Sequence, residues 1–141
     1  ATNHIMSQPL ALIVDDHGDS AIIFSEAMRT AGFAVEVAHS GDEALARLVG
    51  ITPDVVILDL CLPRVAGTEI LRHIRGDERL AAAYVIIVSA DPILAGTSLD
   101  QANQVLIKPI GFSWLRDLAV ALAGQLDANK RRTGTKQARN S

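Results

Sequence analysis

The sequence predicts an α/β fold built on a doubly wound, five-stranded parallel sheet with helices on both faces. Short apolar runs recur along the chain, and three of them are rich in Val, Ile and Leu without the polar alternation of a strand that faces solvent. The runs stand roughly 20–30 residues apart with helix-like patterns between them, which is typical of repeated βαβ units. Right-handed crossovers between parallel strands then leave few possible topologies.

Five strands and about five helices are expected to account for residues 9–127. A chain of 141 residues with 49% apolar content can form one globular domain with a buried core. Neither an internal repeat nor a second domain is indicated. We expect the strands at residues 10–14, 33–37, 55–58, 85–88 and 105–107.

Several helix ends can be recognised from local sequence. Ser40 and Glu43 form a capping box, in which the serine caps the helix start and the glutamate lies three residues on. Gly32 follows the helical stretch 20–31, where a left-handed helix stop is expected. The last helix shows apolar residues at three- and four-residue spacing, namely Trp114 or Leu115, Leu118, Ala119 and Leu122.

Composition narrows the class of protein. No apolar run approaches the roughly 20 residues that span a bilayer, and no basic segment followed by an apolar core marks a secretory signal. The single cysteine, Cys61, cannot form an internal disulfide, which suits a reducing compartment. We therefore expect a cytoplasmic protein with no membrane partner.

Charge is distributed unevenly along the chain. Residues 130–141 carry several Lys and Arg residues and no acid, so the rest of the chain is strongly acidic. An acidic body argues against direct nucleic-acid binding. We expect residues 128–141 to form a basic flexible tail that could contact an anionic partner. Residues 1–8 are expected to be a disordered N-terminus that begins with a vector-derived remnant before a native start at Met6.

Polar residues stand just past four of the predicted strands. Asp15 and Asp16 follow the first strand, Asp59 the third, Ser89 the fourth and Lys108 the fifth. In an open parallel sheet, ligands bind outside the carboxyl ends of the strands, near the point where the strand order reverses. We therefore expect these side chains to form one site.

Three neighbouring carboxylates repel one another unless a cation neutralises them. Ligand sets made only of oxygen favour a hard ion, here Mg²⁺ or else Mn²⁺. Asp16 and Asp59 would supply carboxylate oxygens, and the backbone carbonyl of Cys61 would supply a third oxygen. Asp15 would hold a metal-bound water.

The same residues suit phosphoryl transfer. The Asp59 carboxylate would attack phosphorus in line while the metal ion neutralises charge on the incoming group. The Lys108 ammonium and the Ser89 hydroxyl would each bind a phosphoryl oxygen. Because phosphoryl transfer depends chiefly on positioning and electrostatics, a site this small is sufficient.

The ordered set of motifs resembles the receiver domains of bacterial response regulators, and the likeness spans residues 9–127. This resemblance implies a flavodoxin-like sheet of order 2-1-3-4-5 and a phosphoryl group received from a histidine kinase or a histidine phosphotransfer protein. It also implies slow self-dephosphorylation instead of enzyme turnover. The motifs that carry it are Asp15-Asp16, Asp59 in Leu-Asp-Leu-Cys-Leu-Pro, Ser89-Ala90 and Lys108-Pro109.

Further expectations come with the resemblance. The Lys108–Pro109 bond should be cis, and Ala90 should belong to the part of the domain that switches. The phosphorylated domain would bind an unidentified downstream protein, as a monomer or weak dimer. It would act either as a stand-alone regulator or as a receiver module of a hybrid kinase.

The sequence also departs from the family pattern. Val105 stands where the family usually has Tyr or Phe, so an inward-swinging ring cannot report phosphorylation here. The segment between Ser89 and Lys108 is shorter than usual, and Pro92 and Gly96 disfavour a helix within it. We expect a fourth helix that is short or irregular and an atypical output face.

Other interpretations of these residues stay open. Asp15 and Asp16 could cap the first helix, and Ser89 could cap a later one. A haloacid-dehalogenase-type phosphatase also uses an aspartyl phosphate, but it needs a second acid where Cys61 stands. A flavodoxin-like cofactor binder would need a Ser/Thr/Gly-rich phosphate loop in place of the two aspartates.

Several conspicuous residues are assigned no chemistry. Cys61 is expected to have an inert side chain. Phe112 and Trp114 are expected to pack in the core or at an interface. The four histidines show no ligand spacing, which argues against a metal role for His4, His17, His39 and His73.

Overall fold

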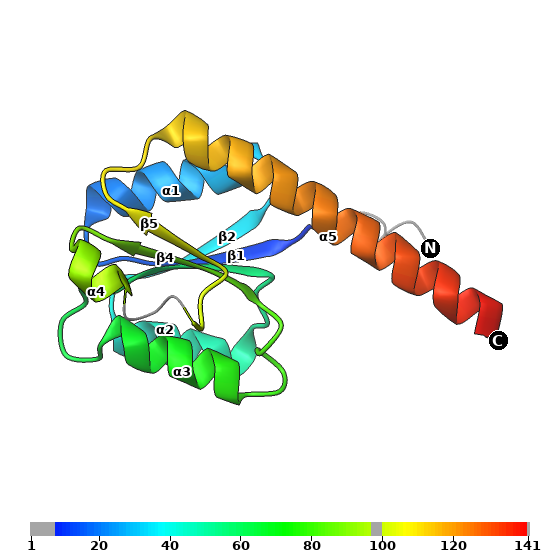
Figure 1. Ribbon diagram of the computed structural model, residues 1–141, viewed down its shortest axis with the longest axis horizontal. Coiled ribbons are helices and arrows are strands. Elements are labelled where there is room, and N and C mark those ends of the chain that lie inside the picture. Colours follow the sequence, from blue (N-terminus) through cyan, green and yellow to red (C-terminus); the bar gives the residue numbers. More distant parts are fainter. Residues whose placement is uncertain (1–7, 97–99, 141) are drawn as a thin grey trace.

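The computed structural model describes residues 8–96 and 100–140, the last ten of them only as the backbone of a helix (Figure 1). Five strands form one parallel sheet in the order β2-β1-β3-β4-β5, the doubly wound order expected of the fold. The strands are β1 (Leu10–Val14), β2 (Ala34–Ala38), β3 (Val55–Asp59), β4 (Tyr84–Ser89) and β5 (Gln104–Ile107). The helices are α1 (Gly18–Thr30), α2 (Gly41–Gly50), α3 (Gly67–Gly76), α4 (Pro92–Gly96) and α5 (Phe112–Asn140).

Helices cover both faces of the sheet. In Figure 1, α1 and α5 lie on one face and α2 and α3 on the other, while α4 lies beside the ends of β4 and β5. Each face has its own apolar core cluster. The three inner strands are almost wholly buried, whereas the edge strands β2 and β5 are only partly so. This burial explains why the inner strands lack polar alternation.

The helix ends follow the sequence signals. Ser40 Oγ accepts a hydrogen bond from the Glu43 backbone N–H at 3.1 Å, as a capping box requires. The Glu43 carboxylate reaches back to the His39 N–H at 3.0 Å, one residue before the expected donor. Gly32 has φ +102°, so it ends α1 in the left-handed conformation. In α5, Leu115 is buried and Trp114 is half exposed. Leu115 therefore belongs to the apolar face of the helix that packs on the sheet.

The fourth helix is short, as the sequence predicts. α4 has five residues, and Asp91 caps it by accepting a hydrogen bond at Oδ1 from the Ile93 N–H at 3.0 Å. Part of the segment predicted to be irregular, residues 97–99, lies outside the described residues.

The turn before β5 is held by Arg75 at the end of α3. Its guanidinium donates to the carbonyl of Gln101 at 2.7 Å and to Asn103 Oδ1 at 2.7 Å. It also donates to the carbonyls of Ala81 and Ala83. Burial lowers the pKa of Arg75, and these acceptors compensate for the lost water. The turn is therefore fixed by side-chain bonds.

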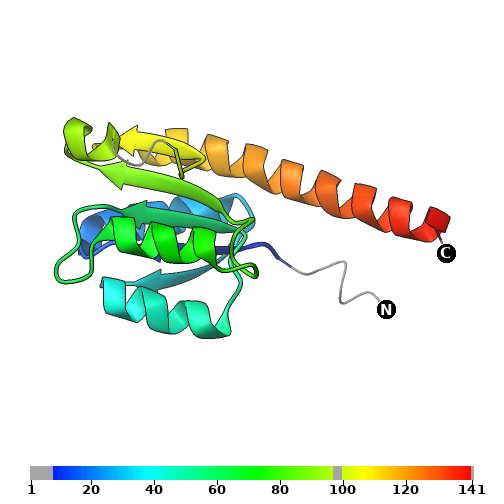
Figure 2. The ribbon, with the colours of Figure 1, turned by 60° about the horizontal axis from the view of Figure 1, so that its bottom comes forward.

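The last helix extends further than the sequence suggests. α5 runs to Asn140, past the boundary predicted at residue 127 and through the stretch predicted to be a flexible tail. Both views show it continuing beyond the sheet (Figures 1 and 2). Residues 128–140 contain five Lys or Arg and two Ala, which are good helix formers, and no proline.

None of the helices in the described part of the chain is both long and apolar enough to cross a membrane.

Candidate functional site

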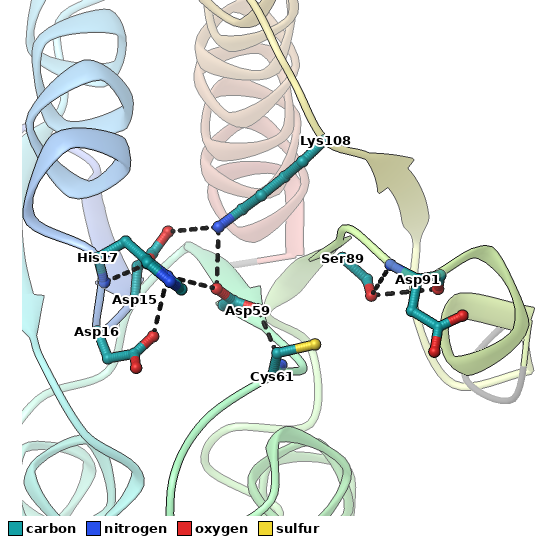
Figure 3. Close-up of polar contacts among 8 residues, drawn as sticks. All are labelled: Asp15, Asp16, His17, Asp59, Cys61, Ser89, Asp91 and Lys108. Carbon is teal, nitrogen blue, oxygen red and sulfur yellow. Dashed lines mark hydrogen bonds and ion pairs between the residues drawn. The ribbon is translucent and has the colours of Figure 1, made fainter.

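The site lies at the carboxyl ends of the strands, where the sheet order reverses. β1 and β3 are neighbours at this reversal, and their ends carry Asp15 and Asp59. Lys108 follows β5 and reaches across to both carboxylates (Figure 3). Three of the residues predicted from separate strand ends therefore meet at one point, as the strand-edge argument requires.

The carboxylates differ in exposure. Asp15 and Asp59 are buried, with 1% and 2% of their surface exposed, whereas Asp16 is partly open to solvent. Two backbone N–H groups fix the buried pair: His17 donates to Asp15 Oδ1 and Cys61 donates to Asp59 Oδ1, each at 2.8 Å. Each aspartate thus keeps its second oxygen, Oδ2, turned toward the cation of the site.

Lys108 is that cation. Its Nζ lies 3.0 Å from Asp59 Oδ2 and 3.3 Å from Asp15 Oδ2. Burial by itself would lower the pKa of the Lys108 ammonium. The hydrogen bond and the charge of Asp59, joined by those of Asp15, outweigh burial and raise that pKa. The ammonium therefore stays charged and offsets much of the repulsion between the two buried carboxylates.

His17 joins the cluster, although the sequence prediction gave it no metal role. Its Nδ1 lies 3.1 Å from Asp16 Oδ1, 3.4 Å from Asp15 Oδ1 and 3.7 Å from Asp59 Oδ2. One ligand atom from each of these four residues falls within 4.8 Å of the others. His17 directly follows Asp15 and Asp16 in the sequence, so its spacing to this acid pair, and not to another histidine, is the signal that places it here.

The cluster borders an open depression of about 490 Å³. His17, Asp59, Cys61, Ala90 and Lys108 are among its lining residues. Cys61 is exposed. Three of the four residues that could ligate a metal ion beside it, Asp15, Asp16 and Asp59, offer carboxylate oxygen. Such a donor set fits a hard divalent cation, because Mg²⁺ needs few protein oxygens and keeps several waters. The acidic cluster could therefore bind a metal ion.

Ser89 stands apart from this cluster. Its side chain is buried, and its hydroxyl accepts a hydrogen bond from the Asp91 N–H at 3.0 Å and donates to the Asp91 carbonyl at 3.2 Å. Figure 3 shows the Ser89–Asp91 pair on the far side of Asp59 from His17. The structure thus brings Ser89 to the same edge of the sheet but not into hydrogen-bonding contact with Asp59 or Lys108.

The remaining predicted positions lie close by. The Lys108–Pro109 peptide bond is cis, as expected. Ala90 lines the depression, and Val105 packs against the core on the α2–α3 face. Asp15 and Asp16 do not cap α1, because the helix begins at Gly18 and its N-cap residue is His17, with no side-chain capping bond.

Gly67 is a site residue that the sequence analysis missed. It opens α3, and a Cβ at this position would lie 2.7 Å from the Asp59 carbonyl oxygen and 2.8 Å from Leu60 Cα. Only a residue without a side chain lets the helix approach the end of β3 so closely. A glycine that follows a strand and opens a helix was the available signal.

Known proteins resemble this chain in both sequence and structure. The family model of the response regulator receiver domain matches residues 11–119. The transcriptional regulatory protein TrcR of Mycobacterium tuberculosis is 34% identical over 116 residues, which cover 82% of this chain and 44% of that protein. The probable methanogenesis regulatory protein FilR2 of Methanothrix harundinacea is 32% identical over 118 residues, with 76% of each chain covered.

The structural comparison gives the same fold. A CheY-like response regulator receiver domain from Methylobacillus flagellatus superposes with a TM-score of 0.73 at 26% identity, covering 82% of this chain and 99% of that one. The chain spans less than half the length of TrcR. The likeness therefore concerns the receiver part of the longer relative.

Proposed function

The chain belongs to the family of response regulator receiver domains, which are signalling domains of two-component systems, and we propose that it accepts a phosphoryl group on Asp59. The donor would be a phosphohistidine of a histidine kinase or a histidine phosphotransfer protein. The observation that carries the proposal is the contact of Asp59 Oδ2 with Lys108 Nζ at 3.0 Å beside the acid pair. One carboxylate thus has both a cation and two neighbouring ligands for a metal.

The chemistry requires a carboxylate oxygen of Asp59 to attack phosphorus. An O–P bond forms as the N–P bond of the phosphohistidine breaks, and the leaving imidazole keeps the electron pair and takes a proton. The Cys61 N–H orients the Asp59 carboxylate through Oδ1. As negative charge develops on the phosphoryl group, the Lys108 ammonium would shift its hydrogen bond from the Asp59 carboxylate to a phosphoryl oxygen.

A divalent cation, Mg²⁺ or Mn²⁺, would be held by Asp16, Asp59 and the backbone carbonyl of Cys61, with Asp15 holding a metal-bound water. When bound, the ion supplies positive charge that offsets the carboxylates and the incoming phosphoryl group. Asp15 and Asp59 are buried and held by backbone donors, so Asp59 needs little rearrangement to serve as a ligand and Asp15 needs little to hold the water.

The conformational response would begin at Ser89. Its hydroxyl now bonds the main chain of Asp91, and Asp91 also caps α4. If Ser89 turned toward a phosphoryl oxygen, the Asp91 N–H would lose its partner and the start of α4 would be free to shift. Val105 cannot act as a swinging ring, so the β4–α4 connection would carry the signal to a downstream protein.

The test is to incubate the purified chain with acetyl phosphate and Mg²⁺ and to measure its intact mass. The proposal predicts one added phosphoryl group on the parent chain, and this group should be labile in base. The Asp59→Asn variant should gain no such group. Asp91→Asn, which keeps a side chain of the same size beside the site, is the matched control and should still be labelled. The proposal would be wrong if the mass of the parent did not change, or if Asp59→Asn were labelled as much as the parent.

A further inference from the structure

We propose that the His17 imidazole is a ligand of the metal site, and that the resulting nitrogen–oxygen donor set binds Zn²⁺ more tightly than Mg²⁺. The inference deepens the proposed function, since it concerns the cation of the same site. It adds a ligand that the acid pair and Asp59 do not provide and a class of ion that an oxygen-only site would not select.

The geometry places the imidazole nitrogen where a cation would be shared. His17 Nδ1 faces the Oδ1 atoms of Asp15 and Asp16 at 3.4 and 3.1 Å. Donor atoms on opposite sides of one ion are separated by at most about 4.2 Å, twice the usual bond length of 2.1 Å. The four candidate atoms already lie within 4.8 Å of one another, so small side-chain rotations bring them to coordinating distance.

Lys108 does not compete for the Oδ1 atoms of Asp15 and Asp16. It takes the Oδ2 atoms of Asp15 and Asp59, whereas His17 is nearest to the Oδ1 atoms of Asp15 and Asp16 (Figure 3). An ion bound between His17 and the acid pair could therefore form while the ammonium stays in place. The arrangement separates a cation-binding side of the cluster from the lysine side.

His17 is free to move onto or away from an ion. Its side chain is 63% exposed, and its ion-pair distances among the described residues are to the three carboxylates. An imidazole exposed to this degree has room to rotate toward an ion. A Mg²⁺ ion, which prefers oxygen and water, can leave the imidazole unused.

Ligand chemistry then decides which ion gains from His17. Imidazole suits Zn²⁺ and similar transition cations, while carboxylates and water suit Mg²⁺. Imidazole nitrogen and carboxylate oxygen are both ordinary zinc ligands. Zn²⁺ and Mg²⁺ would share Asp16, so their binding should be mutually exclusive.

Isothermal titration calorimetry of the full chain, free of any affinity tag, tests this with ZnCl₂ and MgCl₂ as probes. We expect one Zn²⁺ site tighter than the Mg²⁺ site, weakened when excess Mg²⁺ is present. His17→Asn should lower the Zn²⁺ affinity by at least about 10-fold. It should change the Mg²⁺ affinity by less than about twofold, because Mg²⁺ does not need the imidazole.

Two control variants make the result specific. His73→Asn removes an exposed histidine from α3 and should leave Zn²⁺ affinity unchanged, and Cys61→Ser tests whether the nearby thiol is the ligand instead. The inference is overturned if His17→Asn binds Zn²⁺ as the parent does, if it loses both ions equally, or if only Cys61→Ser loses Zn²⁺. Labelling of the parent chain by acetyl phosphate in Mg²⁺ alone tests the proposed function separately from either outcome.

Discussion

Lys108 Nζ lies 3.0 Å from Asp59 Oδ2, and this contact joins the ends of two strands that are not neighbours in the sheet. β4 lies between β3 and β5, so the lysine must reach across the end of a strand to the carboxylate. Its side chain is 17% exposed and the carboxylate 2%. The contact therefore makes the end of β5 sensitive to any change of charge on Asp59.

Replacing this lysine should destabilise the fold in a pH-dependent way. Lys108→Met leaves two buried carboxylates without their cation, at a cost of about 1–3 kcal/mol near neutral pH. Because the pKa of Lys108 is raised in the folded state, its stabilisation is complete below the unfolded value of 10.5 and is lost as pH rises through the higher folded pKa. Urea denaturation from pH 8 to 11.5 should show the difference from the parent shrinking, whereas Lys130→Met should show no such trend.

Removing one acid should have the opposite effect when no metal is present. Asp16→Asn relieves like-charge repulsion, so it should raise the free energy of unfolding of the metal-free protein by about 0.5–1 kcal/mol. The thermal midpoint should rise accordingly. The same variant should lose the stabilisation that Mg²⁺ gives the parent, because it has lost a proposed ligand. Differential scanning calorimetry with and without MgCl₂ checks both. Equal Mg²⁺ stabilisation of both proteins would contradict the assignment, and Asp117→Asn on α5 is the charge-matched control.

Ser89 should couple the phosphoryl site to the start of α4. In the parent, a phosphoryl mimic such as beryllofluoride should shift the amide NMR signals of Asp91 and Ile93, because the Ser89 hydroxyl leaves the Asp91 main chain. Ser89→Ala should lose that shift at equal occupancy of the mimic and be less stable by about 1 kcal/mol. Ser25→Ala is the control, since the buried Ser25 hydroxyl has no hydrogen-bond partner among the residues that the structure describes. A shift that survives in Ser89→Ala would exclude the proposed coupling.

The hydrogen bonds of the Arg75 guanidinium, here called the Arg75 clamp, should stabilise the turn before β5. Arg75→Met removes donors from four acceptors, including Gln101 and Asn103, and should cost about 2–4 kcal/mol. Arg72→Met, on the exposed side of the same helix, should change stability by less than about 0.5 kcal/mol. Urea denaturation monitored by circular dichroism compares the two, and similar small effects would show that the clamp contributes little.

The sequence predicted the parts of the fold that depend on short-range patterns. The buried apolar runs located the strands, and the capping box at Ser40 and the stop at Gly32 located two helix ends. Strand ends that carry Asp15, Asp59 and Lys108 could be assigned to one site because parallel strands share an edge. These are consequences of strand periodicity and sheet topology, which a single sequence contains.

Other features depend on contacts between distant segments and could not be predicted in this way. The Arg75 clamp joins residues far apart in sequence, and no local pattern marks it. The approach of His17 to three carboxylates depends on the rotamer of one exposed side chain. Ser89 was assigned to the site by position, but the direction of its hydroxyl follows from the fold of the loop that contains Asp91.

Gly67 should be required for the close approach of α3 to the phosphoryl site. Gly67→Ala places a Cβ within 2.7 Å of the Asp59 carbonyl oxygen and 2.8 Å of Leu60 Cα, and neither backbone atom can move without displacing the end of β3. The variant should be destabilised by about 1–3 kcal/mol and should be labelled more slowly by acetyl phosphate, since the shift reaches Asp59 itself. Gly76→Ala at the other end of α3 meets nothing within 4 Å, so it should be neutral or stabilising by up to about 1 kcal/mol. Denaturation and intact-mass kinetics on the pair separate the steric effect from helix propensity, and equal behaviour of the two variants would refute the role given to Gly67.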